Sequence, residues 1–272
     1  MRTILNYSRW QGLHEAHERD SLELLDRRSR SPKWSVRQGV AENPNCPVEI
    51  LDRLSRDSSW AVRGAVASNP NCPVEILDRL SRDEEESSVL YHVASNPNST
   101  VEILDRLSRD EDLAVRRSVA ENPNCPVEIL DRLSRDEENV RIAVSDNPNS
   151  TAEILERLYR DEDAVIWVRL RVASHPNSTA EILQRLSRDK EKSVRWNVAR
   201  NPNTSIETLA ALTRDRDERV RDEAVSRLAR VKSKRPELRD RIEELESTVE
   251  LGIRGDEDPT DLDDLDLSGL DI

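Results

Sequence analysis

A fifteen-residue stretch returns along the chain almost unchanged and constrains the fold more than any other feature. Its first copy, residues 43–57, reads Asn-Pro-Asn-Cys-Pro-Val-Glu-Ile-Leu-Asp-Arg-Leu-Ser-Arg-Asp. The prolines of the Asn-Pro-Asn or His-Pro-Asn signature lie 26, 27, 26, 25, 28 and 26 residues apart, at Pro44, Pro70, Pro97, Pro123, Pro148, Pro176 and Pro202. Repeats of about 20 to 50 residues are typical of solenoids, in which each repeat packs mainly against its neighbours. The sequence therefore predicts a stacked array of repeats.

The composition of the 272 residues agrees with a thin core that runs along a stack. Only 35% of the residues are hydrophobic, and none is phenylalanine. The net charge of −13 disfavours nucleic acid as a partner of the whole chain. No stretch is apolar enough to span a membrane, and the first residues lack the apolar run of a signal peptide. The expected location is the cytoplasm.

Each repeat contains two helical patterns, and we call the first of them the leucine helix. It places Val48, Leu51 and Leu54 on one apolar face, while Glu49 and Arg53 lie four residues apart on the polar face. The second pattern, the arginine helix, reads Val-Arg-x-x-Val-Ala and stops before Asn-Pro, because the residue before proline avoids the α region. The arginine helix is predicted to be the shorter one, short enough for 3-10 geometry as an alternative to an α-helix.

The residue ahead of each leucine helix predicts how that helix is capped. Four repeats show the capping-box pattern of Ser or Thr followed three residues later by Glu: Ser99 with Glu102, Ser150 with Glu153, Ser178 with Glu181 and Thr204 with Glu207. Three repeats have Cys there and Pro at the expected first helical position, namely Cys46, Cys72 and Cys125. We interpret these cysteines as small substitutes for the capping residue, with a metal or redox role as the alternative. Since stacked helices lie about 8–10 Å apart, free thiols are expected.

The pattern divides the chain into four expected parts. Residues 1–20 are expected to form an N-terminal cap, residues 21–229 an array of eight repeats, residues 230–252 a C-terminal capping helix and residues 253–272 an acidic tail. Within this acidic tail, residues 256–272 contain seven Asp, one Glu and no Lys or Arg. Such a segment either docks onto a partner, docks onto its own array or remains solvated.

With its Val-Arg-x-x-Val-Ala, Asn-Pro-Asn, Leu-x-x-Leu and closing Asp, the repeat resembles the leucine-rich repeat variant family, relatives of HEAT-like α-solenoids. The resemblance covers about residues 22–229. It implies an all-α, right-handed solenoid in which α-helices stack with 3-10 helices and strands are absent. One described architecture of that family adds a cysteine-rich iron–sulfur segment, but residues 1–45 contain no Cys, so no cofactor is expected. The family implies a fold and a binding surface, not a reaction.

One arginine per repeat forms a candidate ladder, which we call the arginine ladder. Its members are Arg37, Arg63, Arg116, Arg141, Arg169, Arg195 and Arg221, and Leu90 interrupts the row. Regularly spaced guanidinium groups can follow a phosphate backbone, so a nucleic-acid-binding solenoid is the alternative function. The favoured interpretation is structural. The Asp that closes each leucine helix precedes a ladder arginine by a short loop, as Asp57 precedes Arg63, and the two side chains are expected to form a bidentate clamp.

The two residues after each ladder position, which we call the variable pair, are the favoured candidates for binding. They differ in every repeat while their flanks stay nearly constant. Helical geometry turns them away from the buried Val and Ala positions, so they are expected to share one solvent face. The candidate partner-binding residues are Gln38, Tyr91, His92, Arg117, Ile142, Leu170, Arg171, Trp196, Asn197 and Asp222. Neutral drift is the alternative explanation for this variation. However, drift should also have varied the residues on the outer face of the leucine helix, and these are nearly identical between repeats.

Aromatic residues and histidines complete the candidates. Trp34, Trp60 and Trp167 lie near the starts of arginine helices, where they act either as binding anchors or as packing residues. His14 and His17 have the spacing of a weak metal site, but a polar cap face is the favoured reading. No catalytic, metal or cofactor constellation emerges. The sequence therefore favours a non-enzymatic scaffold for a protein or peptide, with an enzyme of the HEAT-like DNA glycosylase type as a distant third.

Overall fold

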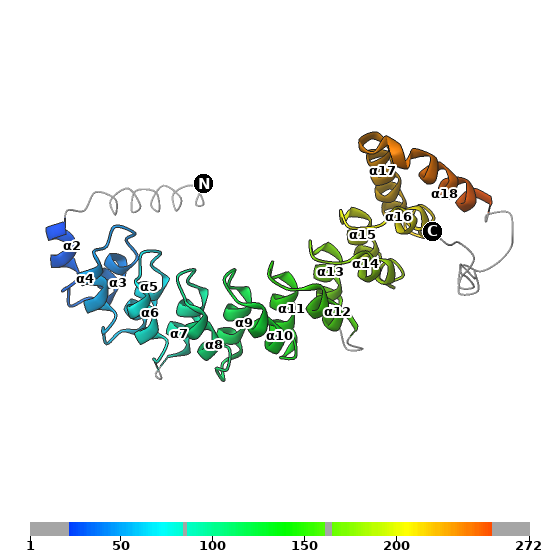
Figure 1. The fold of residues 1–272 in the computed structure, drawn as a ribbon. Coiled ribbons are helices and arrows are strands. Elements are labelled where there is room, and N and C mark those ends of the chain that lie inside the picture. The colour runs from blue at the N-terminus through cyan, green and yellow to red at the C-terminus, as the bar shows by residue number, and fades with distance from the viewer. Residues whose placement is uncertain (1–21, 84–85, 161–164, 252–272) are drawn as a thin grey trace, which may run out of the picture. The chain divides into compact units, whose positions relative to one another are not determined.

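All regular structure in the described part of the chain is helical, as predicted. The computed structural model describes residues 22–83, 86–160 and 165–251, which contain 17 α-helices and one 3-10 helix (Figure 1). The chain divides after Asn177 into two compact bodies, which we call the N-terminal body and the C-terminal body. No helix within the described ranges combines the length and apolar character that crossing a membrane requires. The expected N-terminal cap and acidic tail lie outside the described residues.

The N-terminal body alternates leucine helices and arginine helices. The leucine helices are α2 (Leu22–Arg28), α4 (Val48–Leu54), α6 (Val74–Leu80), α8 (Val101–Leu107), α10 (Val127–Leu133) and α12 (Ala152–Arg160). The arginine helices are α3 (Trp34–Ala41), α5 (Trp60–Ser68), α7 (Ser87–Ser95), α9 (Leu113–Glu121), α11 (Glu138–Asp146) and α13 (Ile166–Ser174). Consecutive arginine helices pack side by side, and leucine helices contact the arginine helices that precede and follow them (Figure 1). The predicted repeat array is thereby confirmed.

The C-terminal body continues the alternation and then closes with longer helices. It contains α14 (Ala180–Leu186), α15 (Lys192–Arg200), α16 (Ile206–Leu212), α17 (Glu218–Lys234), the 3-10 helix η1 (Pro236–Leu238) and α18 (Arg239–Leu251). Helices α17 and α18 both pack against α16. Leu209, Leu228 and Ile242, one from each of these three helices, share a core in which none is more than 1% exposed. Burying such side chains stabilises by about 1.5–3 kcal/mol each, which holds the last helices on the array.

The predicted order of the two helix lengths is wrong. Leucine helix Val48–Leu54 has seven residues and arginine helix Trp60–Ser68 has nine. The leucine helix ends early because the amides of Arg56 and Asp57 bond to carbonyls only three residues back, in tight turns. The arginine helix gains a turn because residues ahead of its motif already adopt helical geometry. Both are α-helices, and 3-10 geometry within the described ranges is assigned to Pro236–Leu238.

The predicted capping boxes are displaced by one residue. Helix α8 begins at Val101, and its cap is Thr100, whose hydroxyl accepts the N–H of Ile103 at 3.5 Å. Ser99 is buried instead, and its hydroxyl donates to the carbonyl of Val93 at 2.6 Å, which ties the leucine helix to the preceding arginine helix. The hydroxyls that accept the equivalent N–H in other repeats belong to Thr151, Thr179 and Ser205. The sequence pattern placed the cap on the wrong one of two adjacent hydroxyl residues.

The three cysteines occupy the buried serine position, so they are not substitutes for a cap. Cys46, Cys72 and Cys125 are buried free thiols, as predicted, and each sulfur contacts the carbonyl of the following proline at 3.8, 3.8 and 3.9 Å respectively. Burial raises the pKa of Cys46 to about 11 and the pKa values of Cys72 and Cys125 to about 12. The thiolate is the nucleophile and metal ligand, so these thiols are inert near neutral pH.

Candidate functional site

The Asn-Pro-Asn signature joins neighbouring repeats as well as stopping a helix. The buried side chain of Asn122 donates from Nδ2 to the carbonyls of Ala94, at 2.7 Å, and Asn96, at 3.0 Å, both in the preceding repeat. Its Oδ1 accepts the N–H of Asn124 at 2.9 Å. Equivalent bonds are made by Asn69, Asn96 and Asn147. Sequence reasoning missed this joint, although the recurrence of Asn in almost every copy was its signal.

His175 replaces the asparagine in one repeat and makes two of the equivalent bonds. The ring is 4% exposed, and Nδ1 accepts the N–H of Asn177 at 3.0 Å. Since Nδ1 is the acceptor, Nε2 carries the hydrogen and donates to the carbonyl of Asn147 at 2.9 Å. This histidine is therefore a structural substitute.

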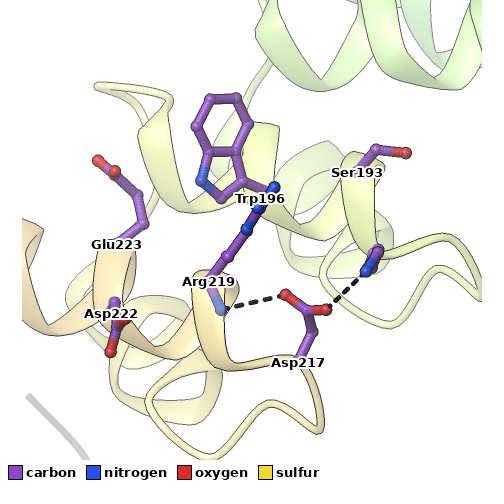
Figure 2. A pocket seen from close by; sticks show the side chains of 7 residues that line it. Ser193, Trp196, Asp217, Arg219, Asp222 and Glu223 are labelled. Carbon is purple, nitrogen blue, oxygen red and sulfur yellow. Dashed lines mark hydrogen bonds and ion pairs between the residues drawn. The ribbon is translucent and has the colours of Figure 1, made fainter.

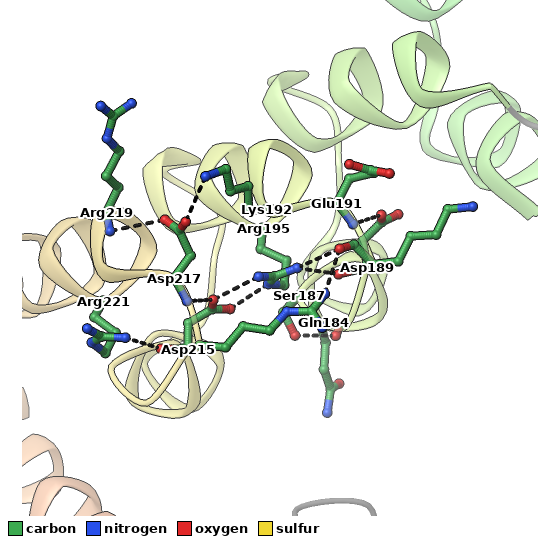
Figure 3. Close-up of polar contacts among 12 residues, drawn as sticks. Gln184, Ser187, Asp189, Glu191, Lys192, Arg195, Asp215, Asp217, Arg219 and Arg221 are labelled. Atoms are coloured by element: carbon green, nitrogen blue, oxygen red, sulfur yellow. Dashed lines mark hydrogen bonds and ion pairs between the residues drawn. The ribbon is translucent and has the colours of Figure 1, made fainter.

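The arginine ladder forms clamps, but with a different carboxylate from the one predicted. Arg195 binds Asp215 through two nitrogens, with Nε–Oδ2 and Nη2–Oδ1 distances of 2.5 and 2.9 Å (Figure 3). Its Nη1 donates to the carbonyls of Asp189, at 2.7 Å, and Lys190, at 3.1 Å. The preceding Asp thus offers its backbone, and the carboxylate comes from the Asp twenty residues later. Equivalent pairs are Arg37–Asp57, Arg63–Asp83 and Arg116–Asp136, with Nε–Oδ2 distances of 2.5, 2.6 and 2.8 Å.

The remaining ladder members are Arg141, Arg169 and Arg221. Arg221 donates from Nη1 to the carbonyl of Asp215 at 2.7 Å, while Arg141 and Arg169 lie half-buried in α11 and α13. Within the clamps, hydrogen bonding to Asp215 raises the pKa of Arg195 against the opposing effect of burial. Burial raises the pKa of Asp136, but the hydrogen bonds and charge of Arg116 outweigh it, so this pKa is lowered overall. Both shifts keep the clamps charged near neutral pH.

A second set of ion pairs links the leucine helices of adjacent repeats. Arg106 contacts the carboxylate of Asp78 at 2.8 Å through Nη2 and donates to the hydroxyl of Ser81 through Nη1. Hydrogen bonds from Arg106 and Arg82 hold the pKa of Asp78 below its ordinary value. Equivalent pairs are Arg53–Asp26, Arg79–Asp52, Arg132–Asp105 and Arg157–Asp131. These contacts explain why the leucine-helix face is copied, so its constancy is no evidence against neutral drift at the variable pair.

The variable pair is less uniformly exposed than helical geometry predicts. Among the candidates, Tyr91, Arg117, Arg171 and Asp222 are exposed, whereas Gln38, His92, Ile142, Leu170, Trp196 and Asn197 are partly buried. In three repeats the second position is fully buried, as Ala65, Ser118 and Ala143. The neighbouring arginine helix covers this position, since the hydroxyl oxygens of Ser118 and Ser95 lie 3.1 Å apart. The accessible part of the variable pairs therefore includes the first members Tyr91, Arg117 and Asp222 and the second member Arg171.

Gly64 and His92 pack together across two repeats and allow a test of this packing. An alanine Cβ at position 64 would lie 2.9 Å from Cδ2 of His92, whose Nδ1 lies 2.9 Å from the hydroxyl of Ser68. Gly64→Ala within a helix normally gains about 1 kcal/mol, but here overpacking should cost about 1–3 kcal/mol. In the His92→Ala background, the same change should become stabilising. Urea unfolding of the four proteins of the double-mutant cycle measures the coupling, and equal effects in both backgrounds would contradict it.

Three successive repeats of the N-terminal body form a groove on the arginine-helix surface, which we call the three-repeat groove. Its volume is about 310 Å³, and Arg117 of α9, Ile142 of α11 and Arg171 of α13 line it. Arg117 pairs with Glu121 at 2.7 Å, and Arg171 with Asp146 at 3.4 Å. These side chains are about half exposed, so their ion pairs are weak and a ligand can replace either partner. The groove thus presents an aliphatic side chain between two exchangeable arginines.

A pocket of about 440 Å³ lies between α15 and α17 in the C-terminal body (Figure 2). It is lined by Lys192, Ser193, Trp196, Asp217, Arg219, Asp222 and Glu223, and we call it the Trp196 pocket. The guanidinium carbon of Arg200 lies 4.5 Å from the centre of the Trp196 ring, a cation–π contact. The pocket brings the candidates Trp196 and Asp222 together. Lys192 and Arg219 were missed because their positions carry no repeated signal in the sequence.

Three further tryptophans are exposed at the starts of arginine helices. Trp34, Trp60 and Trp167 are 51%, 47% and 59% exposed. Trp34 and Trp60 occupy equivalent positions in adjacent repeats, so they lie on the same side of adjacent helices. Half-exposed tryptophans are typical anchors for a partner. In the described part of the chain, no group of three or more His, Cys, Asp or Glu side chains is placed to hold a metal, and His14 and His17 lie outside it.

The fold and these surfaces define a helical repeat scaffold, and comparison with known proteins specifies the type of repeat. A family model described as leucine rich repeat variant matches residues 34–59, 60–85 and 113–138. A solved structure, described as a leucine-rich repeat variant with a novel repetitive structural motif, is 29% identical over 76% of this chain and 81% of that chain, with a TM-score of 0.56. This chain therefore carries leucine-rich repeat variant repeats, and the resemblance seen in the sequence is confirmed.

Other comparisons add little. An engineered protein of known structure is 18% identical over 85% of this chain and 83% of that chain, with a TM-score of 0.42. A second engineered protein is 19% identical over 79% of this chain and 97% of that chain, with a TM-score of 0.29. Both likenesses are too weak to support an argument about function. No curated protein matches the chain.

Proposed function

We propose that the protein is a non-enzymatic scaffold that binds a protein or peptide partner through the accessible members of its variable pairs. The observation that carries this proposal is the three-repeat groove. There, Arg117, Ile142 and Arg171 come from three successive repeats and line one cavity. Residues that differ between repeats thereby combine into one composite surface, which is how repeat proteins distinguish partners.

The chemistry of the groove favours an extended segment with an aliphatic side chain between acidic ones. Ile142 offers apolar contact at the centre, and the two arginines offer bidentate donors to carboxylates on either side. Because the ion pairs with Glu121 and Asp146 are half exposed, replacing them costs little. Exposed tryptophans on other arginine helices supply further anchors for a longer partner.

The clamp geometry argues against the alternative function, nucleic-acid contact through the arginine ladder. The side chains of Arg37, Arg63, Arg116 and Arg195 are at most 15% exposed, and each binds a carboxylate and a backbone carbonyl. Contact with a phosphate would require breaking these bonds and leaving a covered aspartate without its partner, which is costly.

The proposal is tested by selecting displayed random peptides on the full chain and measuring the affinity of the winners for variants. Ile142→Ala and Arg171→Ala should each weaken binding at least tenfold, equivalent to about 1.4 kcal/mol. The matched control is Arg82→Ala with Arg109→Ala, since these arginines, each two residues beyond the end of a leucine helix, are 62% and 58% exposed. Unchanged affinity in the groove variants, or an equal loss in the control, would contradict the proposed surface.

A further inference from the structure

The loops that precede the arginine helices differ in charge. Three loops of the N-terminal body are acidic, reading Asp-Glu-Glu-Glu at residues 83–86, Asp-Glu-Asp at residues 110–112 and Asp-Glu-Glu at residues 136–138, whereas the loop before α3 contains Arg30 and Lys33. In the C-terminal body, Lys190 lies in the loop before α15 and Lys192 is the first residue of that helix, while Arg216 lies in the loop before α17 and Arg219 is the second residue of that helix. Acidic residues alternate with these basic ones along the chain. Two of the five lysines of the chain lie here, at the start of α15.

These four residues form what we call the basic rim. Lys190, Lys192 and Arg216 line a cavity of about 420 Å³ together with Glu191, Arg195 and Asp217. Arg216 donates from Nη2 to the carbonyl of Lys190 at 2.6 Å, which connects the two loops. Lys192 pairs with Asp217 at 3.1 Å but is 68% exposed, so this pair is weak and exchangeable (Figure 3). Arg195 belongs to its clamp and is not part of the rim.

The basic rim adjoins the Trp196 pocket, because Lys192 and Asp217 line both cavities and Arg219 lines the pocket. Basic side chains and an indole thus lie side by side. The acidic lining residues Asp222 and Glu223 oppose an anionic ligand on the α17 side (Figure 2). A ligand that fits this surface therefore places its carboxylates at the basic rim and its aliphatic side chains against Trp196.

We infer that this ligand is the chain's own acidic segment, residues 256–272. The segment carries seven Asp, one Glu and no basic residue, and Leu262, Leu265, Leu267, Leu270 and Ile272 alternate with the acids. Helix α18 ends at Leu251 within the C-terminal body, and the 21 residues that follow can extend over at most about 70 Å. The carboxylates bind the basic rim while the leucines cover Trp196. Docking in this way withholds the C-terminal part of the variable-pair surface from other ligands.

This inference is independent of an external partner, because the three-repeat groove belongs to the other body. Failure of the peptide selection would leave it intact, and its own failure would leave the groove intact. The acidic segment and the basic rim are both present in the full chain, so the full chain is the material for the test.

The test is zero-length carbodiimide cross-linking of the full chain at low salt, followed by mass spectrometry. The reaction joins only amines and carboxylates in contact, and Lys232 with Glu246, at 2.6 Å, supplies an internal positive control. We expect the acids of residues 256–272 to cross-link to Lys190 and Lys192. The yield should fall several-fold at about 1 M salt, where the screening length is about 3 Å.

Two variants separate the rim from the pocket without removing any cross-linking group from Lys192 or the segment. Arg216→Gln and Trp196→Ala should each lower the yield at Lys192 several-fold, whereas Trp167→Ala, in the N-terminal body, should not. Persistence of the Lys232–Glu246 link shows that each variant is folded.

Three outcomes would overturn the inference. The first is a Lys232–Glu246 link with none from the acidic segment to the rim. The second is a segment that reacts mainly with Lys234 or Lys33. The third, in a mixture of isotope-labelled and unlabelled protein, is a majority of links between the two species, which would mean docking onto a second copy.

Discussion

Replacing Arg195 with alanine should destabilise the C-terminal body by about 3–5 kcal/mol, the usual cost of breaking a buried ion pair by removing one partner. The side chains of Arg195 and Asp215 are 5% and 6% exposed, so water cannot replace the lost bonds fully. The carbonyls of Asp189 and Lys190 would lose their shared donor as well. Urea unfolding followed by circular dichroism measures the loss.

Two comparisons make this result specific to the clamp. Arg200→Ala removes an exposed arginine from the same helix, which only stacks on Trp196, and should cost less than about 1 kcal/mol. Arg195→Lys keeps the charge but loses the planar guanidinium group. Its loss of stability should therefore lie between those of Arg195→Ala and Arg200→Ala. If Arg195→Ala cost no more than Arg200→Ala, the clamp would not be a major source of stability.

The pH dependence of a clamp has a defined sign. The pKa of Asp136 is lowered in the folded protein: burial raises it, but Arg116 and the backbone N–H of Glu137 together outweigh burial. A carboxyl group whose pKa is lowered in the folded state stabilises the fold fully at pH values above its unfolded pKa of about 3.9. This contribution to stability is lost as the pH falls through the pKa of the folded state. The difference in stability between the wild-type protein and Arg116→Ala should therefore shrink below about pH 4.

Replacing Asn122 with alanine should cost about 2–4 kcal/mol, because two buried carbonyls in the preceding repeat lose their donor. The N–H of Asn124 loses its acceptor at the same time. Unfolding by urea gives the total cost, and amide hydrogen exchange should show that the joint between α9 and α7 opens first. Loss of the joint is expected without loss of the helices themselves.

The chain supplies its own control for this joint. His175 already makes the equivalent bonds to Asn147 and Asn177, so His175→Asn should change stability by less than about 1 kcal/mol. Asn122→Asp keeps the shape but turns an acceptor toward the two carbonyls, and it should be at least as damaging as alanine. A tolerated Asn122→Asp would show that the donor bonds contribute little.

The repeat period made the helical scaffold predictable from the sequence. The sequence alone did not determine which of two adjacent residues caps a helix, or which of two aspartates pairs with a ladder arginine. The apolar spacing of Val48, Leu51 and Leu54 indicates a helical face in any structure. The cap was placed one residue early because Ser99 and Thr100 both carry a hydroxyl, and only packing decides which one is buried. The clamp partner was missed because an Asp lies on either side of each ladder arginine in sequence, and stacking selects the later one.

The proposed recognition surface was predictable only in part. A single helix suggests that both members of a variable pair face solvent, but the next arginine helix covers Ala65 and Ser118. Clustering of Arg117, Ile142 and Arg171 in one groove depends on how three repeats stack, which no single repeat encodes. Unrepeated charges such as Lys192 became visible as site residues only beside Trp196.

The constant spacing of the clamps has a consequence for how such a chain can evolve. Each of the four clamps described above spans twenty residues and avoids the loop that varies from three to six residues between repeats. The joints reuse the same donors and acceptors, so many repeats present interchangeable ends. Duplication or excision of one whole repeat by recombination would re-create a matched junction without any compensating mutation. Array length can therefore change in single steps, while the residues that distinguish one repeat from another are reshuffled into new combinations.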